Sequence, residues 1–361
     1  MTTTAPAPPG FRTLTVAAVD RDTDDSVVVT FDCGDDPMPF AHGQHLTLRR
    51  EVDGVEIRRS YSICSPAPTG PLKVAIKRVP GGAFSTWATT DLRVGDRCEV
   101  MAPSGHFTHE LQPEQRRRYV LLAAGSGITP VLSIMATILE HEPQSSVSLV
   151  YVNRTSTSTM LLEELEDLRD RHLGRVRIAY LFTREATESA LLSGRPDRER
   201  LDALIAADLL PAEVDHAFLC GPMDLVAEAE AALTAAGMSA EAIHRELFTT
   251  NQLGTAPRQA PQPVDDSLGV VAEGTAVLYG RETDIVVYEG DSVLDAVQRV
   301  RPDAPFSCRS GVCSTCQATL TEGSVDMAVN YGLDSHDLER GYVLTCQSTP
   351  TTASVRVDYD S

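Results

Sequence analysis

Four cysteines near the carboxyl-terminal end constrain the fold more than any other feature of the sequence. Cys308, Cys313 and Cys316 are spaced five and then three positions apart, and Cys346 follows thirty positions later. This is the ligand spacing of a [2Fe-2S] cluster, in which a tight loop wraps one side and a separate strand supplies the last thiolate. A structural zinc site is the alternative, although zinc loops usually carry two CxxC pairs. We predict a cluster bound by these four thiolates.

The chain of 361 residues is long enough for two or three domains, and its motifs support three. The other cysteines, Cys33, Cys64, Cys98 and Cys220, show no disulfide-like spacing, and the first residues do not resemble a signal peptide. We expect a cytoplasmic protein, because free thiols persist in a reducing compartment.

The net charge of −20 argues against binding to nucleic acid or to an anionic membrane surface. Residues 271–361 hold fourteen acidic residues against six arginines and no lysine. This acidity fits either a solvated surface or a docking face for a basic partner.

One uncharged run, residues 119–139, reaches the length of a membrane span. Gly125, Gly127 and Pro130 interrupt it. A buried parallel strand followed by a buried helix therefore accounts for the run better than a bilayer does.

Short alternating segments follow a Thr, Ala and Pro-rich leader at residues 1–10. Strands are expected at residues 11–19, 26–31, 45–49, 55–64, 72–79 and 97–101, with Gly, Pro and Asp at the turns. Six short strands predict an antiparallel β-barrel, which we assign to residues 11–112.

A cation, an aromatic ring and a hydroxyl lie close together on the fourth of these strands, at Arg59, Tyr61 and Ser62. Arg59 and Tyr61 share a face because side chains alternate along a strand. The Gly81-Gly82 turn then enters a helix expected at residues 84–92, whose free N–H groups suit a phosphate. Each signal is weak alone, and together they predict a site for a diphosphate and a planar ring.

Strands alternate with helices between residues 117 and 249. Strands are expected at residues 119–123, 147–153, 176–182, 216–219 and 243–248, with helices from about residues 129 and 157 and one ending at Gly237. This alternation predicts a parallel, doubly wound α/β sheet.

Two strand-to-helix turns of this domain carry candidate binding residues. Glycines at positions 125 and 127 let a pyrophosphate approach a helix N-terminus, although the third glycine of the dinucleotide fingerprint is missing. Cys220 lies at the carboxyl edge of the sheet, where such sheets bind ligands. A buried cysteine is equally common as core packing.

A Pro, Gln and Thr-rich stretch at residues 250–268 predicts an inter-domain linker. Strands near residues 275–279 and 285–289, a helix at residues 292–300, the cluster loop, and strands after Cys316 and near residues 355–358 follow it. We expect a small α+β domain of the β-grasp type at residues 269–361.

These motifs together resemble a known family. The stretches that carry the resemblance are residues 43–48, 59–64, 123–130, 327–333 and 341–344. The first two domains resemble the ferredoxin-NADP reductase superfamily, and the third resembles plant-type ferredoxins. The domain order and the last two stretches are similar to the reductase subunits of phenylacetyl-CoA epoxidase (phenylacetate-CoA oxygenase) systems.

The resemblance implies FAD, NADPH or NADH, and the [2Fe-2S] cluster as cofactors. Arg59 would bind the FAD diphosphate, Tyr61 would stack on the isoalloxazine ring, and Ser62 would lie near flavin N5. The other implied FAD contacts are Lys77, Gly82, Phe84 and Ser85.

For the nicotinamide nucleotide, the family pattern implies a cradle and a ring site. The implied residues are Gly125, Ser126, Gly127, Thr129, Cys220, Gly221, Pro222, Glu246 and Phe248. The expected catalytic residues are Tyr61, Ser62, Cys220 and Glu246. Arg154 and Arg184 follow the second and third strands of the sheet, where arginine can meet a 2′-phosphate, and favour NADPH slightly.

The implied activity is electron transfer from NAD(P)H through FAD and the cluster to an oxygenase. In the systems that this domain order resembles, the oxygenase is a di-iron epoxidase of phenylacetate catabolism. The sequence has no pair of Glu-x-x-His motifs on two helices, so the oxygenase is expected to be a separate polypeptide.

Two other functions stay open. The same architecture could serve a Rieske-type aromatic-ring or steroid hydroxylase, and only the stretch from about residue 330 to 344 speaks against it. A ferredoxin-like carrier with a silent flavin module is less compatible with the intact motifs at residues 59–62 and 125–129.

Overall fold

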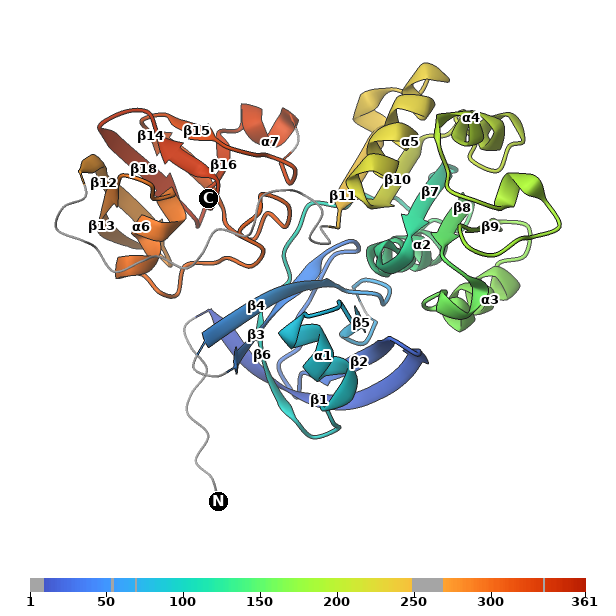
Figure 1. Ribbon diagram of the computed structural model, residues 1–361, viewed down its shortest axis with the longest axis horizontal. Helices are drawn as coiled ribbons and strands as arrows, with labels where there is room; N and C mark the ends of the chain where they lie inside the picture. Colours follow the sequence, from blue (N-terminus) through green and yellow to red (C-terminus); the bar gives the residue numbers. More distant parts are fainter. Residues whose placement is uncertain (1–9, 53–54, 69, 249–268, 334) are drawn as a thin grey trace. The chain divides into compact units, whose positions relative to one another are not determined.

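The computed structural model describes residues 10–52, 55–68, 70–248, 269–333 and 335–361. The chain divides into two compact units (Figure 1). The large unit comprises Thr13–Ile57 and Tyr61–Thr250, and the small unit comprises Met1–Arg12, Arg58–Ser60 and Asn251–Ser361. The predicted linker and the first nine residues of the predicted leader lie outside the described residues.

The first sheet has six strands in the order β4-β3-β6-β1-β2-β5. The strands are β1 (Phe11–Thr23), β2 (Ser26–Asp32), β3 (His45–Val52), β4 (Val55–Ser62), β5 (Lys73–Lys77) and β6 (Arg97–Met101). The two ends of this order are joined by an antiparallel bridge between Ile63 and Val74. The predicted antiparallel barrel is therefore confirmed, as is the short helix α1 (Ala83–Thr90) that follows the glycine turn.

The second sheet is parallel throughout its five strands, in the order β11-β10-β7-β8-β9. Its strands are β7 (Arg118–Ala124), β8 (Ser146–Asn153), β9 (Val176–Phe182), β10 (His216–Gly221) and β11 (Ile243–Leu247). Helix α2 (Ile128–His141) packs against β7, β8 and β10, α3 (Leu162–Arg171) against β9, and α5 (Met223–Ala235) against β10 and β11 (Figure 1). The predicted doubly wound sheet is confirmed.

The helix predicted from about residue 157 begins later than expected. Ser156–Ser158 form only a 3₁₀ turn, and α3 starts at Leu162. The cause is Leu161, whose φ of 55° is left-handed and breaks the helical path. A further helix, α4 (Arg198–Ala206), was not predicted.

One apolar cluster joins the barrel to the parallel sheet, while the barrel interior forms a second cluster of its own. Val28, Cys64 and Phe107 of the barrel side pack in the same cluster as Leu121 of β7 and Met135 of α2. The uncharged run at residues 119–139 is thereby explained as β7 and α2, both buried. Within the described part of the chain, no helix combines the length and apolar character that a membrane crossing requires.

The small unit contains a mixed sheet in the order β13-β12-β18-β14-β16. Its strands are β12 (Val270–Leu278), β13 (Arg281–Tyr288), β14 (Gln317–Glu322), β16 (Tyr342–Leu344) and β18 (Ser354–Asp358). Strands β12 and β18 run parallel, the other pairs run antiparallel, and α6 (Val293–Val300) packs on β13. This confirms the predicted β-grasp domain. The short elements β15 (Val325–Met327), α7 (Ser335–Glu339) and β17 (Ser348–Pro350) were not predicted.

Candidate active site and cluster loop

The cysteine loop has a backbone that turns repeatedly into left-handed conformations. Arg309, Gly311 and Ser314 have φ values of 52°, 75° and 52°. A loop bent in this way directs N–H groups toward sulfur, and Ser310 N lies 3.4 Å from Cys308 Sγ. Left-handed conformations cost about 1–2 kcal/mol per non-glycine residue, so the loop needs support from its surroundings.

A buried ion pair supplies part of that support. The Arg309 guanidinium contacts the Asp295 carboxylate at 2.7 Å, and both side chains are 8% exposed. Asp295 also closes the capping box of α6 with Ser292. Burial alone would raise the pKa of Asp295, but hydrogen bonds from Ser292 and Arg309 outweigh burial and hold this pKa below its usual value. The loop is thus fixed to the first turn of α6.

The residues on either side of the fourth cysteine fasten the other side of the site. Gln347 Nε2 lies 2.9 Å from the Arg309 carbonyl oxygen and 3.4 Å from Cys346 Sγ. Thr345 Oγ1 donates to the Cys316 carbonyl oxygen at 2.8 Å. These bonds join the loop to the segment that follows β16.

The four thiols are arranged in two interacting pairs. A hydrogen bond from Cys313 lowers the pKa of Cys308, and one from Cys316 lowers the pKa of Cys346. A [2Fe-2S] cluster with four cysteine ligands needs two thiolates on each iron. The donor set therefore fits this cluster.

Residues 330–333, part of a stretch that favours the epoxidase reductases in the sequence analysis, lie directly against the cluster loop. Ser314 Oγ donates to the Gly332 carbonyl oxygen at 2.8 Å, and a Cβ at Gly332 would lie 2.4 Å from Ser314 Oγ. Asn330 holds the turn by two hydrogen bonds with Leu333, at 3.0 and 3.1 Å. Only glycine leaves room for Ser314 there.

In the large unit, an aromatic cluster lies where β4 ends. The rings of Tyr61 and Phe84 are 5.6 Å apart, and Trp87 meets Phe84 edge-on at 5.4 Å. Phe84 is buried, Tyr61 is partly exposed and Ser62 is buried. Arg59 is exposed two residues before Tyr61 on the same strand. A partly exposed ring on a rigid aromatic base suits stacking by a planar ring.

The glycine turn before α1 leaves the start of the helix open. Gly82 is the N-cap, no side chain caps it, and a Cβ there would lie 2.8 Å from Ser85 Oγ. Ser85 Oγ accepts a hydrogen bond from Val79 N–H at 3.0 Å, so its hydroxyl shapes the turn. The uncapped N–H groups and the nearby aromatic ring fit a flavin diphosphate and its ring system.

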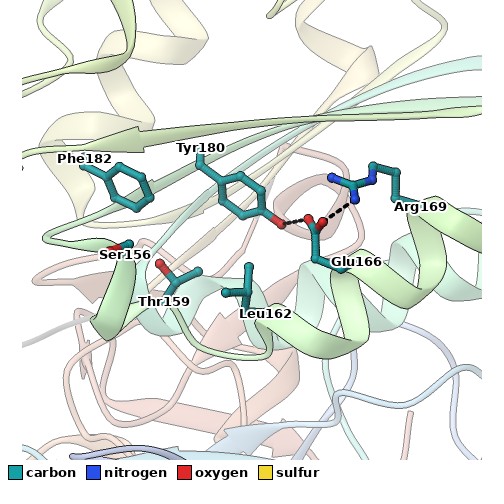
Figure 2. A pocket seen from close by; sticks show the side chains of 7 residues that line it. All are labelled: Ser156, Thr159, Leu162, Glu166, Arg169, Tyr180 and Phe182. Carbon is teal, nitrogen blue, oxygen red and sulfur yellow. Dashed lines mark hydrogen bonds and ion pairs between the residues drawn. The ribbon is translucent and has the colours of Figure 1, made fainter. Parts of the chain in front are cut away.

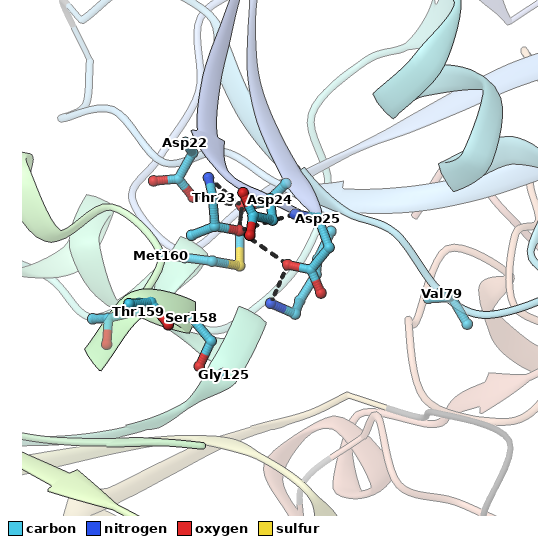
Figure 3. A network of polar contacts seen from close by, with 12 residues as sticks. Asp22, Thr23, Asp24, Asp25, Val79, Gly125, Ser158, Thr159 and Met160 are labelled. Carbon is cyan, nitrogen blue, oxygen red and sulfur yellow. Dashed lines mark hydrogen bonds and ion pairs between the residues drawn. The ribbon is translucent and has the colours of Figure 1, made fainter. Parts of the chain in front are cut away.

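Lys77, predicted as a flavin contact, forms an ion pair with a residue of the barrel itself. Its ammonium forms an ion pair of 2.8 Å with Asp25 in the turn between β1 and β2. Figure 3 shows this acidic turn, with Asp22 close to the loop that contains Ser158 and Met160. Asp22 Oδ1 accepts a hydrogen bond from Leu161 N at 2.8 Å, which fastens the barrel turn to the nucleotide-domain loop.

The glycine loop after β7 lies in contact with the end of β10. A Cβ at Gly127 would lie 2.5 Å from the Cys220 carbonyl oxygen and 3.2 Å from Cys220 Sγ. Gly125 has a φ of 53°, and a Cβ built there meets nothing within 4 Å. Thr129 Oγ1 donates to the Ser126 carbonyl oxygen at 3.1 Å. The loop therefore presents an open surface at the N-terminus of α2, as pyrophosphate binding requires.

Three of the predicted catalytic residues come together beside this loop. Cys220 and Glu246 are register neighbours on β10 and β11, and Ser62 Oγ lies 3.4 Å from Glu246 Oε2. Burial raises the pKa of the Cys220 thiol, which keeps it protonated. Burial also raises the pKa of Glu246 to about 8, against the opposing effect of Ser62. At neutral pH the carboxyl is therefore largely protonated and can donate a hydrogen bond.

The remaining predicted contacts border the same edge of the sheet. Phe248 N donates to the Gly221 carbonyl oxygen at 3.1 Å, and Pro222 is the N-cap of α5. A Cβ at Gly221 would lie 2.9 Å from the Ala124 Cβ. Gly221 is thus closely packed between β7 and the residue that follows β11, whereas the glycine loop at residues 125–127 has open space at Gly125.

A pocket that sequence reasoning missed lies further along the sheet. It has a volume of about 310 Å³ and lies between β9, α3 and the 3₁₀ turn (Figure 2). The lining residues are Ser156, Thr159, Leu162, Glu166, Arg169, Tyr180 and Phe182. Tyr180 and Phe182 alternate on β9, so two aromatic side chains on one face of that strand were the available signal.

The two arginines expected near a 2′-phosphate are both exposed just beyond β8 and β9. Arg184 N donates to the Arg154 carbonyl oxygen at 2.9 Å. Neither guanidinium forms an ion pair with another described residue. The neighbouring Glu185 carboxylate accepts hydrogen bonds from Ser156 N and Oγ at 2.8 and 3.0 Å.

Replacing Glu246 with glutamine is expected to change how stability depends on pH. The folded carboxyl has a pKa of about 8 against an ordinary value of 4.5, so the folded state binds the extra proton between these values. The free energy of unfolding therefore falls as pH rises through this window, and Glu246→Gln removes the fall. We expect this fall in the free energy of unfolding to be on the order of 1–2 kcal/mol. It is smaller than the full pKa shift would give, because the Glu246 side chain is partly exposed and water screens it.

Urea unfolding of the wild type and the variant, at about pH 5.5 and pH 8.5, measures this difference. Glu140→Gln, at the exposed C-terminal end of α2, is the matched control. A constant difference between wild type and Glu246→Gln at both pH values would contradict the raised pKa.

These sites define the class of protein: an NAD(P)H-dependent oxidoreductase that contains FAD and a [2Fe-2S] cluster. Family models match in three parts of the chain. An oxidoreductase FAD-binding domain matches residues 15–109, an oxidoreductase NAD-binding domain matches residues 121–231, and a 2Fe-2S iron-sulfur cluster binding domain matches residues 277–351. The finer domain limits expected from the sequence stay predictions.

Relatives with the same three parts match along almost the whole chain. A component of the 1,2-phenylacetyl-CoA epoxidase of Escherichia coli (strain K12) is 42% identical, over 97% of this chain and 98% of the relative. The ferredoxin reductase component of 3-ketosteroid-9-alpha-monooxygenase from Mycobacterium tuberculosis is 36% identical, over 96% of this chain and 95% of the relative. The chain belongs to this family of reductases, which carry electrons from NAD(P)H through FAD to a [2Fe-2S] cluster.

Solved structures share the fold. Phthalate dioxygenase reductase covers 97% of this chain and 98% of its own, with a TM-score of 0.57 and 22% identity. An intact type IV self-sufficient cytochrome P450 monooxygenase covers 98% of this chain and 42% of its own, with a TM-score of 0.70 and 24% identity.

Proposed function

We propose that the protein is the reductase component of a phenylacetyl-CoA epoxidase and supplies electrons to a separate di-iron oxygenase. The observation that carries this proposal is the match to the Escherichia coli epoxidase component over 97% of the chain at 42% identity. The turn at residues 330–333 belongs to one of the sequence stretches that favour the epoxidase reductases over other reductases. It lies against the cluster loop, which supports the proposal.

When bound, FAD accepts a hydride from the nicotinamide nucleotide and releases its electrons singly to the cluster. In this proposal Tyr61 supports the flavin ring, and the glycine loop at residues 125–127 holds the pyrophosphate. Cys220 borders the nicotinamide ring as a neutral thiol, because burial raises its pKa. The Ser62 hydroxyl and the protonated Glu246 carboxyl lie beside Cys220, and both groups can donate hydrogen bonds. Catalysis is mainly positioning, since no side chain has to act as a strong base.

Reconstitution with an oxygenase tests the proposal. The purified holoprotein should support NADPH-dependent epoxidation of phenylacetyl-CoA by the oxygenase component of the epoxidase. The second candidate, the reductase of a steroid or aromatic-ring hydroxylase, is favoured by the 36% identity to the Mycobacterium tuberculosis component. Product formation with a steroid hydroxylase oxygenase, and none with the epoxidase, would reject the first candidate in favour of the second.

For the nucleotide, we propose a modest preference for NADPH. The support is the exposed pair Arg154 and Arg184 beyond β8 and β9, close in the chain to the pocket of Figure 2. Two guanidiniums favour a 2′-phosphate, whereas Glu185 disfavours one, which limits the expected preference. Measuring kcat/KM with NADPH and with NADH tests this preference. A higher kcat/KM with NADH would show that NADH is the preferred nucleotide.

We also propose a cytoplasmic location. None of the eight cysteines, all of which lie in the described residues, forms a disulfide, and four of them, Cys33, Cys64, Cys98 and Cys220, are not predicted cluster ligands. Such thiols persist in a reducing compartment.

A further inference from the structure

Three histidines that are far apart in the sequence meet in the large unit. His216 is the first residue of β10, His244 is the second residue of β11, and His109 lies in the segment between β6 and β7. One ring nitrogen of each lies within 4.8 Å of one from each of the others. The closest pair is His216 Nδ1 and His244 Nε2, at 3.3 Å.

The parallel register of the sheet explains two of the three positions. His244 is the register partner of Phe218, and the two rings stack at 4.5 Å. His216 lies two residues before Phe218 and therefore points to the same face of β10. The loop then brings the His109 ring to 3.7 Å from the His216 ring, measured between centroids.

One ring nitrogen of the cluster is unsatisfied. His109 Nε2 is buried and has no hydrogen-bond partner among the described residues. An unpartnered, buried ring nitrogen is costly, and a bound cation would satisfy it.

A fourth histidine, His42, is adjacent but is already occupied. Its Nε2 accepts a hydrogen bond from His109 N–H at 3.2 Å and pairs with Thr108 Oγ1 at 3.1 Å. It therefore fixes the main chain at His109 and is not available as a ligand through that nitrogen.

We propose that His109, His216 and His244 bind one divalent transition-metal ion of the zinc class. Zinc binds histidine nitrogen at about 2.0–2.1 Å, so two ligands of a tetrahedral site are about 3.3 Å apart. The His216 to His244 distance matches this spacing, and a ring nitrogen of His109 lies within 4.8 Å of both. Three imidazole nitrogens suit zinc, whereas magnesium and calcium require oxygen ligands. A water molecule completes the fourth position.

The ion would hold the beginning of β11. His244 and Glu246 lie two residues apart on that strand and therefore on one face. A metal that joins β10, β11 and the loop at His109 fixes the strand that carries Glu246, so the site has a structural role and positions Glu246 indirectly.

The test uses untagged holoprotein with FAD and the cluster in place, so that the cluster thiolates are already occupied. After metal removal by a resin that leaves the cluster intact, zinc sulfate is titrated in a calorimeter. One equivalent should bind and raise the melting temperature, and X-ray absorption at the zinc edge should show nitrogen and oxygen neighbours with no sulfur. Magnesium at the same concentration should not bind.

His109→Gln and His244→Asn should each weaken zinc binding by about tenfold or more, because each removes a ligand. His172→Gln, at the partly exposed end of α3, is the matched control and should bind zinc as the wild type does. Flavin content shows whether each variant has folded. Failure to bind zinc, sulfur neighbours at the zinc edge, or equal binding by wild type and both ligand variants would each overturn the proposal.

Discussion

Cys313→Ser is expected to reduce oxygenase turnover by about 100-fold or more while bound flavin is still reduced by NADPH at the wild-type rate. Removing a residue that hydrogen-bonds to a metal ligand already costs about 10–100-fold in metal affinity or activity. Removing the ligand itself should cost more. Cys313 lies in the cluster loop, where Cys308 N approaches its sulfur at 3.5 Å. Apart from Arg59, the predicted flavin residues belong to the large unit, so we expect them to keep their contacts. Stopped-flow absorbance measures flavin reduction, and product formation by the oxygenase measures electron delivery.

Cys33→Ser makes the same chemical change at a partly buried free thiol of the barrel and serves as the control. It should leave both rates close to those of the wild type. Cytochrome c is a poor acceptor for this experiment, because it can take electrons directly from reduced flavin. If Cys313→Ser supported oxygenase turnover as well as Cys33→Ser does, the cluster would not be the point of electron exit.

Gly127→Ala is expected to lower kcat/KM for NADPH by about 100-fold. The added Cβ would lie 2.5 Å from the Cys220 carbonyl oxygen, so the loop and the end of β10 must separate. Displacement of about 1 Å in a positioned reactant can cost 10²-fold in rate. Single-turnover reduction of the flavin, followed over a range of NADPH concentrations, separates weaker binding from slower hydride transfer.

Gly237→Ala is the control for the general cost of this substitution. Gly237 follows α5 with a φ of 102°, and a Cβ there meets nothing within 4 Å. Strain of about 1–2 kcal/mol should lower stability without changing the kinetics with NADPH. Wild-type kinetics for Gly127→Ala would mean that the loop does not hold the nucleotide in the way proposed.

The sequence was most informative where function requires fixed local spacing. The cysteine spacing identified the cluster loop, and strand alternation identified both the barrel and the parallel sheet. Local patterns did not reveal contacts between distant positions. The buried pair of Arg309 and Asp295 joins residues fourteen positions apart, and Lys77 pairs with Asp25 in the turn between β1 and β2.

Backbone conformation was the second limit. Nothing about leucine predicts the left-handed Leu161 that delays α3, since the conformation is imposed by the surrounding structure. The three-histidine cluster combines a loop and two strands, and only the register between β10 and β11 brings its members together. The roles of all the predicted site residues toward their ligands, including those of Arg59, Ser85 and Phe248, stay predictions.

The apolar cluster that joins the barrel to the parallel sheet has a consequence for motion. Ser133 of α2 donates to the Ser65 carbonyl oxygen at 2.7 Å, and Ala67 N donates to Thr137 Oγ1 at 3.0 Å, both in buried surroundings. Opening a hinge between these two domains would expose the apolar cluster that contains Phe107 and Met135. We therefore expect the barrel and the parallel-sheet domain to keep their relative arrangement when a nucleotide binds.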